Sequence, residues 1–196
     1  TFYDNGKDPS ITFIDDNTVV ALHTDNEHNL RYRIGTLDKG LIFWKGNDTS
    51  IDYDKGTTPS VIAIDSKKVL EVHRGSKGDY SDHLFYRIGM VEGERIEWSG
   101  DGGVEYDRGN SPDIVLLGGE IILEVHKGTY EDQADALFCR LGKIYENKIE
   151  WMRTTGSRYD RGGSPAIATC DGDTVFEVHD GGDVNDDLHY RIGKYK

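Results

Sequence analysis

Residues 3–9 read Tyr-Asp-Asn-Gly-Lys-Asp-Pro and are the first of four copies of the pattern Tyr-Asp-x-Gly-x-x-Pro. The other copies occupy residues 53–59, 106–112 and 159–165. These copies contain all four prolines of the chain, and successive prolines are 50, 53 and 53 residues apart. A fixed period of this length indicates one repeated structural unit, as in a propeller, a solenoid or another array.

Each unit contains short apolar segments separated by polar turns. In the second unit these segments are 60–64, 69–73, 84–89 and 95–98. They are rich in Val, Ile, Tyr and Trp and are bounded by Gly, Asp, Asn or Pro, which is typical of β-strands. No window shows a sustained apolar stripe with a period of 3.6 residues, so we expect almost no helix.

Four strands in a unit of about fifty residues match one blade of a β-propeller. The sequence therefore predicts an all-β fold, a four-bladed β-propeller of antiparallel strands that forms a single domain over residues 1–196. The repeat units fall at residues 1–52, 53–105, 106–158 and 159–196. A five-bladed ring completed by residues outside this sequence is the structural alternative.

The fourth unit stops before the strand that carries tryptophan in the other three units. Either one blade has three strands, or a partner chain supplies the fourth strand, or the sequence is incomplete. An unpaired strand edge is a hazard that proteins usually cover. A homodimer formed through the incomplete blade is therefore one of the interactions we expect.

The charge balance limits the partners of this chain. Its 36 Asp and Glu outnumber its 23 Lys and Arg, which gives a net charge of −13. Phosphate binding needs basic patches, so this charge argues against nucleic acid and against anionic membrane surfaces. No apolar run approaches the roughly 18 residues that a membrane-spanning helix needs, so we also expect no membrane insertion.

The sharpest recurring polar pattern is Glu-Val-His, which the first unit reduces to His23 because Ala21 replaces the glutamate. Residues i and i+2 of a strand face one side, so each carboxylate is expected beside its imidazole. The pair either belongs to a network inside the blade, in which His bonds the Asp of Tyr-Asp-x-Gly or a turn, or binds a ligand. Alternatively, the four equivalent histidines bind a metal, with Glu behind them. The candidates are Glu71, His73, Glu124, His126, Glu177 and His179.

An arginine recurs in the pattern Tyr-Arg-Ile-Gly, and a tryptophan recurs near the end of the last strand. The arginine faces away from its apolar neighbours, so it either pairs with a recurring carboxylate or donates to the hydroxyls or an anionic group of a ligand. The tryptophan either packs in the core or forms a platform for a sugar ring. The further ligand-binding candidates are Arg87, Arg140, Arg191, Trp44, Trp98 and Trp151.

The chain lacks the local patterns of common catalytic and metal sites. It has no Gly-x-Ser-x-Gly and no His-Glu-x-x-His. The acidic segment 180–187 could bind calcium, but its spacing matches no established calcium loop. Glycosidases need two carboxylates in distinct environments, whereas near-identical units supply equal ones. We therefore expect no enzyme activity, no cofactor and no metal.

Together, Tyr-Asp-x-Gly-x-x-Pro-Ser, Glu-Val-His and Leu-x-Tyr-Arg-Ile-Gly resemble the tandem repeats of secreted, lectin-like proteins and of modules attached to secreted enzymes and toxins. The resemblance covers the whole chain and implies a secreted or extracellular protein with carbohydrate pockets on or between blades. We therefore expect a multivalent lectin that gains avidity on glycans or glycoproteins. The alternatives are a non-enzymatic protein-interaction propeller and a propeller that binds metal or haem through its histidines.

Overall fold

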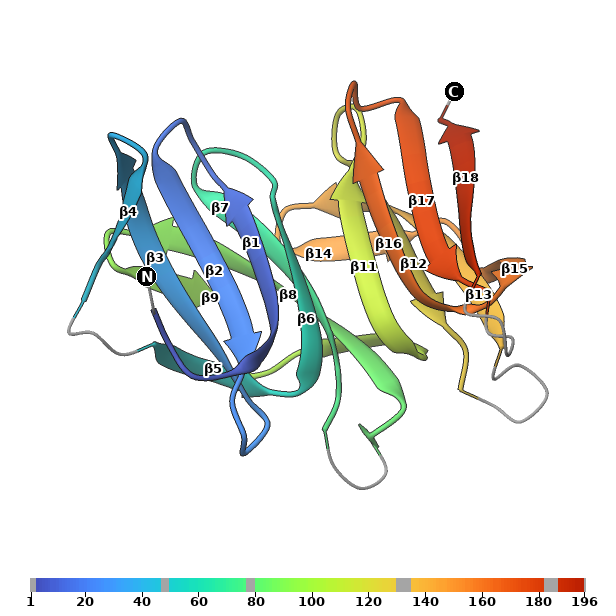
Figure 1. Cartoon of the computed structure of the whole chain (residues 1–196), viewed down its shortest axis with the longest axis horizontal. Helices are drawn as coiled ribbons and strands as arrows, with labels where there is room; N and C mark the ends of the chain where they lie inside the picture. Colours follow the sequence, from blue (N-terminus) through green and yellow to red (C-terminus); the bar gives the residue numbers. More distant parts are fainter. Residues whose placement is uncertain (1–2, 47–49, 77–79, 130–134, 182–186, 196) are drawn as a thin grey trace. The chain divides into compact units, whose positions relative to one another are not determined.

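The computed structural model describes residues 3–46, 50–76, 80–129, 135–181 and 187–195. These residues form eighteen β-strands in four antiparallel sheets (Figure 1). Nowhere in these ranges is there a helix long and apolar enough to cross a membrane. The fold class is the predicted one, a four-bladed β-propeller in which each sheet is one blade.

The blades are numbered here in chain order, and their strands are the following. Blade 1 consists of β1 (Lys7–Phe13), β2 (Thr18–Thr24), β3 (Asn29–Asp38), β4 (Leu41–Trp44) and β5 (Ile51–Lys55). Blade 2 consists of β6 (Thr57–Ala63), β7 (Lys68–Arg74), β8 (His83–Glu92), β9 (Arg95–Trp98) and β10 (Val104–Arg108). Blade 3 consists of β11 (Asn110–Leu116), β12 (Ile121–Lys127), β13 (Ala136–Tyr145), β14 (Lys148–Trp151) and β15 (Ser157–Arg161). Blade 4 consists of β16 (Gly163–Thr169), β17 (Thr174–Asp180) and β18 (Leu188–Lys194).

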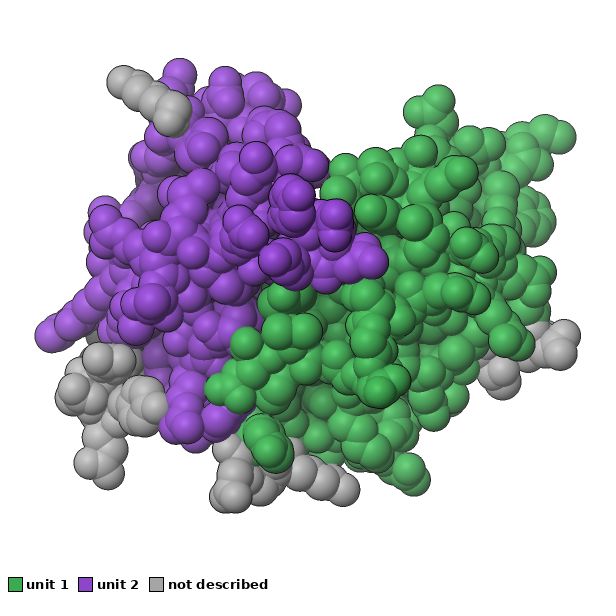
Figure 2. Space-filling model, turned by 180° about the vertical axis from the view of Figure 1, so that it is seen from behind, with its two compact units in different colours: residues 1–81, 85–105 green, residues 82–84, 106–196 purple. Residues whose placement is uncertain are grey.

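The chain divides into two compact units, which Figure 2 colours separately. The first unit contains residues 1–81 and 85–105, and so holds blade 1 and most of blade 2. The second unit contains residues 82–84 and 106–196, and so holds blades 3 and 4. Each unit has its own packed interior and is described by itself.

The Tyr-Asp segment of each later repeat forms a strand of its own, which adds a short member to the sheet before it. These strands are β5, β10 and β15, and each pairs with the third strand of the preceding blade. The third strands are long enough to take two short partners. In blade 1, Gly35–Asp38 of β3 pairs with β4, and Asn29–Tyr32 pairs with β5. Each Tyr-Asp pair therefore lies on one sheet directly before the chain enters the next.

The core of the first unit lies between blades 1 and 2. Tyr32 and Ile34 of blade 1 are only 2% exposed, and their cluster includes Ile96 from β9. The hydroxyl of Tyr32 also accepts a hydrogen bond of 3.0 Å from the backbone N–H of Ile96. Trp98, two residues further along β9, packs against the same cluster. The tryptophan strand of blade 2 therefore closes the core against blade 1.

The glycine of Tyr-Arg-Ile-Gly makes room for that tryptophan strand. A Cβ atom on Gly142 would lie 2.6 Å from Cγ2 of Ile149 and 3.0 Å from Cε3 of Trp151. Gly35 and Gly89 face the equivalent Ile and Trp side chains in blades 1 and 2. Glycine is needed at this position because the side chains of the next strand approach the backbone too closely for any other residue.

The glycine of Tyr-Asp-x-Gly lies against the histidine of the same blade. A Cβ atom on Gly56 would lie 2.6 Å from Cδ2 of His73 and 2.7 Å from the carbonyl oxygen of Arg74. The residue before each motif proline has a positive φ of 48° to 52°, at Asp8, Thr58, Ser111 and Ser164. The motif thus combines a close backbone approach to the histidine with a left-handed residue at a register shift near the start of the first strand of the blade.

Candidate binding site

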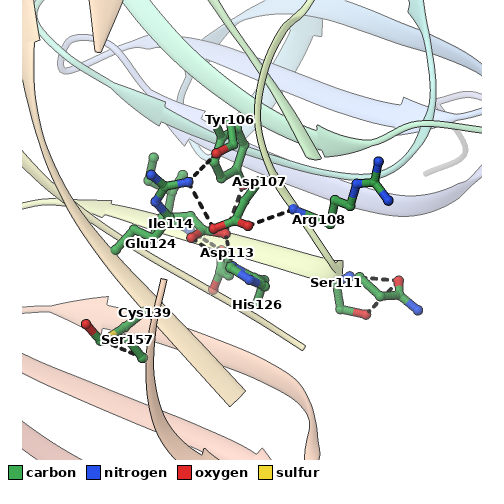
Figure 3. A network of polar contacts seen from close by, with 12 residues as sticks. Tyr106, Asp107, Arg108, Ser111, Asp113, Ile114, Glu124, His126, Cys139 and Ser157 are labelled. Atoms are coloured by element: carbon green, nitrogen blue, oxygen red, sulfur yellow. Dashed lines mark hydrogen bonds and ion pairs between the residues drawn. The ribbon is translucent and has the colours of Figure 1, made fainter. Parts of the chain in front are cut away.

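A Tyr-Glu-His cluster joins Tyr106, on β10, to Glu124 and His126, on β12 of blade 3 (Figure 3). Tyr106 donates its hydroxyl to Oε1 of Glu124 over 2.8 Å, and Nδ1 of His126 lies 3.0 Å from both oxygens of that carboxylate. Glu124 is fully buried and His126 is almost fully buried. The prediction that i, i+2 spacing places carboxylate beside imidazole is confirmed on β12.

Blades 2 and 4 contain the same pair. Nδ1 of His73 is 3.0 Å from Oε1 of Glu71, and Nδ1 of His179 is 2.9 Å from Oε1 of Glu177. The hydroxyl of Tyr159 donates to Glu177 over 2.9 Å, as Tyr106 does to its glutamate. The pair therefore recurs as one packed element in the three blades that keep both residues.

Blade 1 shows what happens when the glutamate is absent. Ala21 occupies its place and is 3% exposed. Neither ring nitrogen of His23 makes a hydrogen bond within the described residues, and Nε2 lies 3.8 Å from Oδ2 of Asp4. The four clusters are therefore unequal, although the sequence repeats.

The recurring arginines reach back to the Tyr-Asp strand. Nη1 of Arg140 lies 2.9 Å from Oδ2 of Asp107 and also donates to the carbonyl oxygen of Tyr106. The equivalent ion pairs are Arg87 with Asp54 at 3.1 Å in blade 2 and Arg191 with Asp160 at 2.5 Å in blade 4. In blade 1, Arg33 donates to the carbonyl oxygen of Tyr3 instead. The arginine thus ties the strand shared with the preceding sheet to its own blade.

The tryptophans stack on the motif tyrosines. Their ring centroids are 5.0 Å apart for Trp44 and Tyr3, 4.7 Å for Trp98 and Tyr53, and 4.9 Å for Trp151 and Tyr106. The arginine of the same blade lies over each tryptophan, as Arg140 does at 4.6 Å from the ring of Trp151. One face of each indole is therefore already covered, and all three rings are half-buried.

Most of the predicted ligand-binding residues thus lie inside the blades. Eight are buried: Glu71, His73, Glu124, His126, Glu177, His179, Arg87 and Arg140. Arg191 differs, because its side chain is 54% exposed. The geometry agrees with the interpretation of an internal network, but the bonding partner of Nδ1 is the Glu on the same strand and not the predicted Asp of Tyr-Asp-x-Gly. Binding through these residues stays a prediction.

Burial and charge shift the pKa values within the clusters. Burial raises the pKa of Tyr106 well above 10, and the charge of Glu124 raises it further. Burial alone would lower the pKa of His126, but Glu124 and Asp107 outweigh it and the pKa is raised above 6.5. Burial lowers the pKa of His23 below 6.5, since Asp4 offsets it only in part.

We expect His126 and His23 to titrate on opposite sides of pH 6.5, the ordinary histidine pKa. His126 stabilises the fold fully below about pH 6.5, and this stabilisation is lost as pH rises through its raised native pKa. His23 acts in the opposite sense, so stability is lost as pH falls from about 6.5 through its lowered native pKa. Titration of the imidazole resonances by NMR measures both values. Identical midpoints for the two rings would contradict the assignment.

A cavity of about 390 Å³ opens beside the cluster of blade 2. Its wall includes Phe85, whose ring stacks on His73 with centroids 5.6 Å apart, and Tyr80, which meets Phe85 edge-on at 6.2 Å. Tyr80 is 58% exposed. The lining also includes Asp54 and Lys55. Aromatic rings with a carboxylate and an ammonium group form a surface that can hold a small polar ligand.

Sequence reasoning reached only part of this cavity. His73 was a predicted site residue, whereas Asp54, as the Asp of Tyr-Asp-x-Gly, was expected as a partner of the recurring His or Arg. Tyr80 and Phe85 were missed. Phe85 had a usable signal, because the residue two before the recurring arginine is aromatic again in Phe138 and His189, which stack on their histidines. Tyr80 falls in a loop that differs between units and had no such signal.

The described residues contain no group of three or more His, Cys, Asp or Glu side chains that could hold a metal ion. The bonded histidines use Nδ1 toward their own glutamate. The acidic segment 180–187 falls mostly outside the described residues. The structure therefore adds no support to the metal or haem alternative.

No protein-family model matches this sequence, and no curated protein matches it. Solved structures match the fold. An exo-β-1,3-galactanase from Phanerochaete chrysosporium with β-1,3-galactotriose aligns over 97% of this chain and 50% of its own, with 8% identity and a TM-score of 0.60. A GH43_1 enzyme from Xanthomonas citri aligns over 96% of this chain and 70% of its own, with 11% identity and a TM-score of 0.57.

A protein of unknown function from Dyadobacter fermentans aligns over 88% of this chain and 48% of its own, with 13% identity and a TM-score of 0.56. The chain thus spans about half the length of this protein and of the galactanase. Identities this low show a shared fold alone.

The expectation that the chain is not an enzyme is wrong. Solved structures with this fold include a galactanase and a GH43_1 enzyme, so the fold does not argue against catalysis. The physical argument behind that expectation, that four near-identical units supply equal environments, is also wrong. Equal repeats were expected to give equal environments, but Ala21 interrupts one cluster, Arg191 is exposed in another, and a cavity opens beside a third.

Proposed function

We propose that this chain binds carbohydrate and that the cavity beside His73 is one of its sites. The observation that carries the proposal is the lining of that cavity, where the rings of Phe85 and Tyr80 stand with the side chains of Asp54 and Lys55. Sugar rings present C–H faces that pack on aromatic rings. Their hydroxyls donate to carboxylates and accept from ammonium groups.

The availability of these groups supports a binding role. The side chain of Asp54 is 20% exposed although it pairs with Arg87, so the carboxylate has capacity left for a ligand hydroxyl. Lys55 donates to Oδ1 of Asn29 over 2.7 Å and keeps further N–H donors. The galactanase with β-1,3-galactotriose provides a second, weaker support, since it is a carbohydrate-active protein with the same fold.

The multivalent, lectin-like form of the proposal extends the site to other blades. In blade 1, a smaller cavity of about 120 Å³ is lined by Tyr3, Asp4 and His23 among others. Elsewhere in blade 1, Arg31 occupies the repeat position of Phe85 and forms an ion pair of 2.6 Å with Asp52. We therefore propose that the blades carry binding sites of unequal affinity for carbohydrate. Several of these sites together would bind a glycan-coated surface outside the cell with avidity.

A glycan array screened with and without EDTA tests binding, and Tyr80→Ala tests the location. We expect saturable binding to one sugar class and about a fivefold to tenfold loss of affinity in the variant, because a stacked ring contributes about 1 kcal/mol. Tyr145→Ala is the matched control, since Tyr145 is a similarly exposed tyrosine in blade 3.

Two results would overturn parts of this proposal. If no glycan on the array binds the protein at high concentration, the proposal of carbohydrate binding is refuted. If Tyr80→Ala leaves the affinity for the glycan unchanged, the binding site does not lie in this cavity. Bound glycans are also analysed for cleavage products, which measures hydrolysis separately from binding.

A further inference from the structure

We propose that blade 1 binds a carboxylate group, from a small free acid or from an acidic sugar, where the other blades place their own glutamate. In blades 3 and 4 the motif tyrosine donates its hydroxyl to that glutamate, and Nδ1 of the histidine lies within 3.0 Å of it. Blade 1 keeps Tyr3 and His23 but has Ala21 in place of the glutamate. Only the acidic-sugar form of this inference rests on the proposed function.

The imidazole of His23 is buried and turned toward this place. It is 2% exposed, and neither ring nitrogen has a hydrogen-bond partner in the part of the chain that the structure describes. Nε2 lies 3.8 Å from Asp4, and the equivalent distance from His179 in blade 4 is 3.6 Å. The two rings therefore have the same orientation. Since Nδ1 of His179 contacts Glu177, Nδ1 of His23 points toward the side of Ala21.

The charge balance of blade 1 favours an added anion. Arg33 is 5% exposed and donates to the carbonyl oxygen of Tyr3, and it forms no ion pair with any described residue. The equivalent arginines each pair with an aspartate, namely Arg87, Arg140 and Arg191. A buried cation is stabilised by a nearby anion. Blade 1 has one carboxylate fewer than the other blades around the same kind of cation.

Repulsion from Asp4 does not exclude a second carboxylate at this site. In blade 4 the ring of His179 contacts Glu177 through Nδ1 and lies 3.6 Å from Asp160 through Nε2. One imidazole between two carboxylates is thus an arrangement that the fold already contains. A carboxylate bound at Nδ1 of His23 would repeat it in blade 1.

The cavity of blade 1 has the size and a further cation for such a ligand. It is lined by Tyr3, Asp4, Gly6, Lys7, Pro9 and His23. Its volume of about 120 Å³ has room for about four water molecules at about 30 Å³ each, and acetate has four heavy atoms. Lys7 belongs to this unit alone, since the other units have Thr57, Asn110 and Gly163. Asp8, which is also particular to this unit, instead accepts from the backbone N–H of Thr58 in blade 2.

Titration of the whole chain with sodium acetate tests the site, with sodium chloride at equal ionic strength as the control. We expect the pKa of His23 to rise from below 6.5 to above it, as that of His126 is raised by Glu124. NMR of the imidazole resonances measures this change, while the other charges that act on His23 stay the same: Asp4, Asp25, Arg31 and Arg33. The thermal midpoint should also rise with acetate, because the ligand binds only the folded chain.

A parallel titration with sodium glucuronate distinguishes the two sources of the carboxylate. A response to both acids supports a site that accepts acidic sugars. A response to acetate alone supports a site for a small free acid, because the cavity then excludes the sugar ring.

Two variants locate the site. Ala21→Glu supplies the carboxylate from the chain itself, so it should raise the pKa of His23 without acetate and weaken acetate binding at least about tenfold. Tyr3→Phe keeps the ring that stacks on Trp44 and removes the hydroxyl. It should weaken acetate binding about fivefold, the effect of one hydrogen bond. Tyr145→Phe is the matched control, since Tyr145 is exposed in blade 3 and should leave the affinity unchanged.

Three results would overturn the proposal. The first is a His23 pKa and a thermal midpoint that acetate leaves unchanged. The second is an equal effect of chloride, which would make the response a general effect of salt. The third is acetate binding of equal affinity in Ala21→Glu. Each of these results leaves the glycan-array result as it is, so they are distinct from a failure of carbohydrate binding.

Discussion

Replacing Gly109 with alanine should lower the free energy of unfolding by about 3 kcal/mol. The new Cβ would lie 2.5 Å from Cδ2 of His126, 2.8 Å from the carbonyl oxygen of Lys127 and 3.0 Å from Cδ1 of Leu84. The imidazole cannot retreat without breaking its contact with Glu124, and a backbone oxygen moves less easily than a side chain. Overpacking of a rigid site costs about 1–3 kcal/mol, and loss of the buried hydrogen bonds adds to it.

Chemical denaturation followed by far-UV circular dichroism measures this effect. Gly102→Ala is the control and should change the unfolding free energy by no more than about 0.5 kcal/mol, because its Cβ would meet nothing within 4 Å. If Gly109→Ala is as stable as this control, the close packing of the motif glycine on the histidine is refuted.

Glu124→Ala should destabilise the fold by about 3–5 kcal/mol. The change removes a fully buried carboxylate that accepts from Tyr106 and lies beside Nδ1 of His126. It leaves a buried hydroxyl and a buried imidazole without their partner, and breaking a buried charged pair costs about this much. The pKa of His126 should also fall below 6.5, since His23 beside Ala21 already has a lowered pKa.

Glu150→Ala is the matched control for this change, because the Glu150 side chain is 62% exposed and pairs only at the surface with Lys148. It should be nearly neutral in the same denaturation experiment. If Glu124→Ala instead abolished carbohydrate binding at an unchanged thermal midpoint, the pair would face ligand and the internal network would be the wrong interpretation.

The repeats made much of the fold predictable. Four copies of one pattern gave the number of blades, and short apolar runs bounded by turn residues placed strands such as β7 close to where they lie. The i, i+2 spacing placed Glu124 beside His126 because the geometry of a strand leaves no other choice for its two side chains. These features depend on local sequence patterns, and the four repeats show the main patterns several times.

The connecting strands could not be predicted in the same way. β5 and β15 are five-residue segments with charged residues at several positions, and their apolar residues are few: Ile51 and Tyr53 in β5 and Tyr159 in β15. They become strands because a ten-residue third strand of the preceding blade leaves half of its edge unpaired. Their pairing is set by another element and by tertiary context, which a single segment does not reveal.

The candidate site was hidden for a related reason. Glu71 and Glu124 looked available for ligands as a recurring polar pattern, but both are fully buried. The cavity in blade 2 instead depends on Tyr80, which comes from a loop that varies between units, and on Phe85. A pattern search finds what the repeats share, whereas this cavity arises where one repeat departs from the others.

The strands shared between sheets have a consequence for how the protein folds. Tyr53 and Asp54 are in β5, which pairs within blade 1, yet both accept hydrogen bonds from Arg87 of blade 2. Asp160 joins blades 3 and 4 in the same way through β15. We therefore expect each repeat to depend on its neighbours for part of its stability, as in a one-dimensional Ising chain. A single excised repeat should remain unfolded, and cooperativity should grow with the number of adjacent copies.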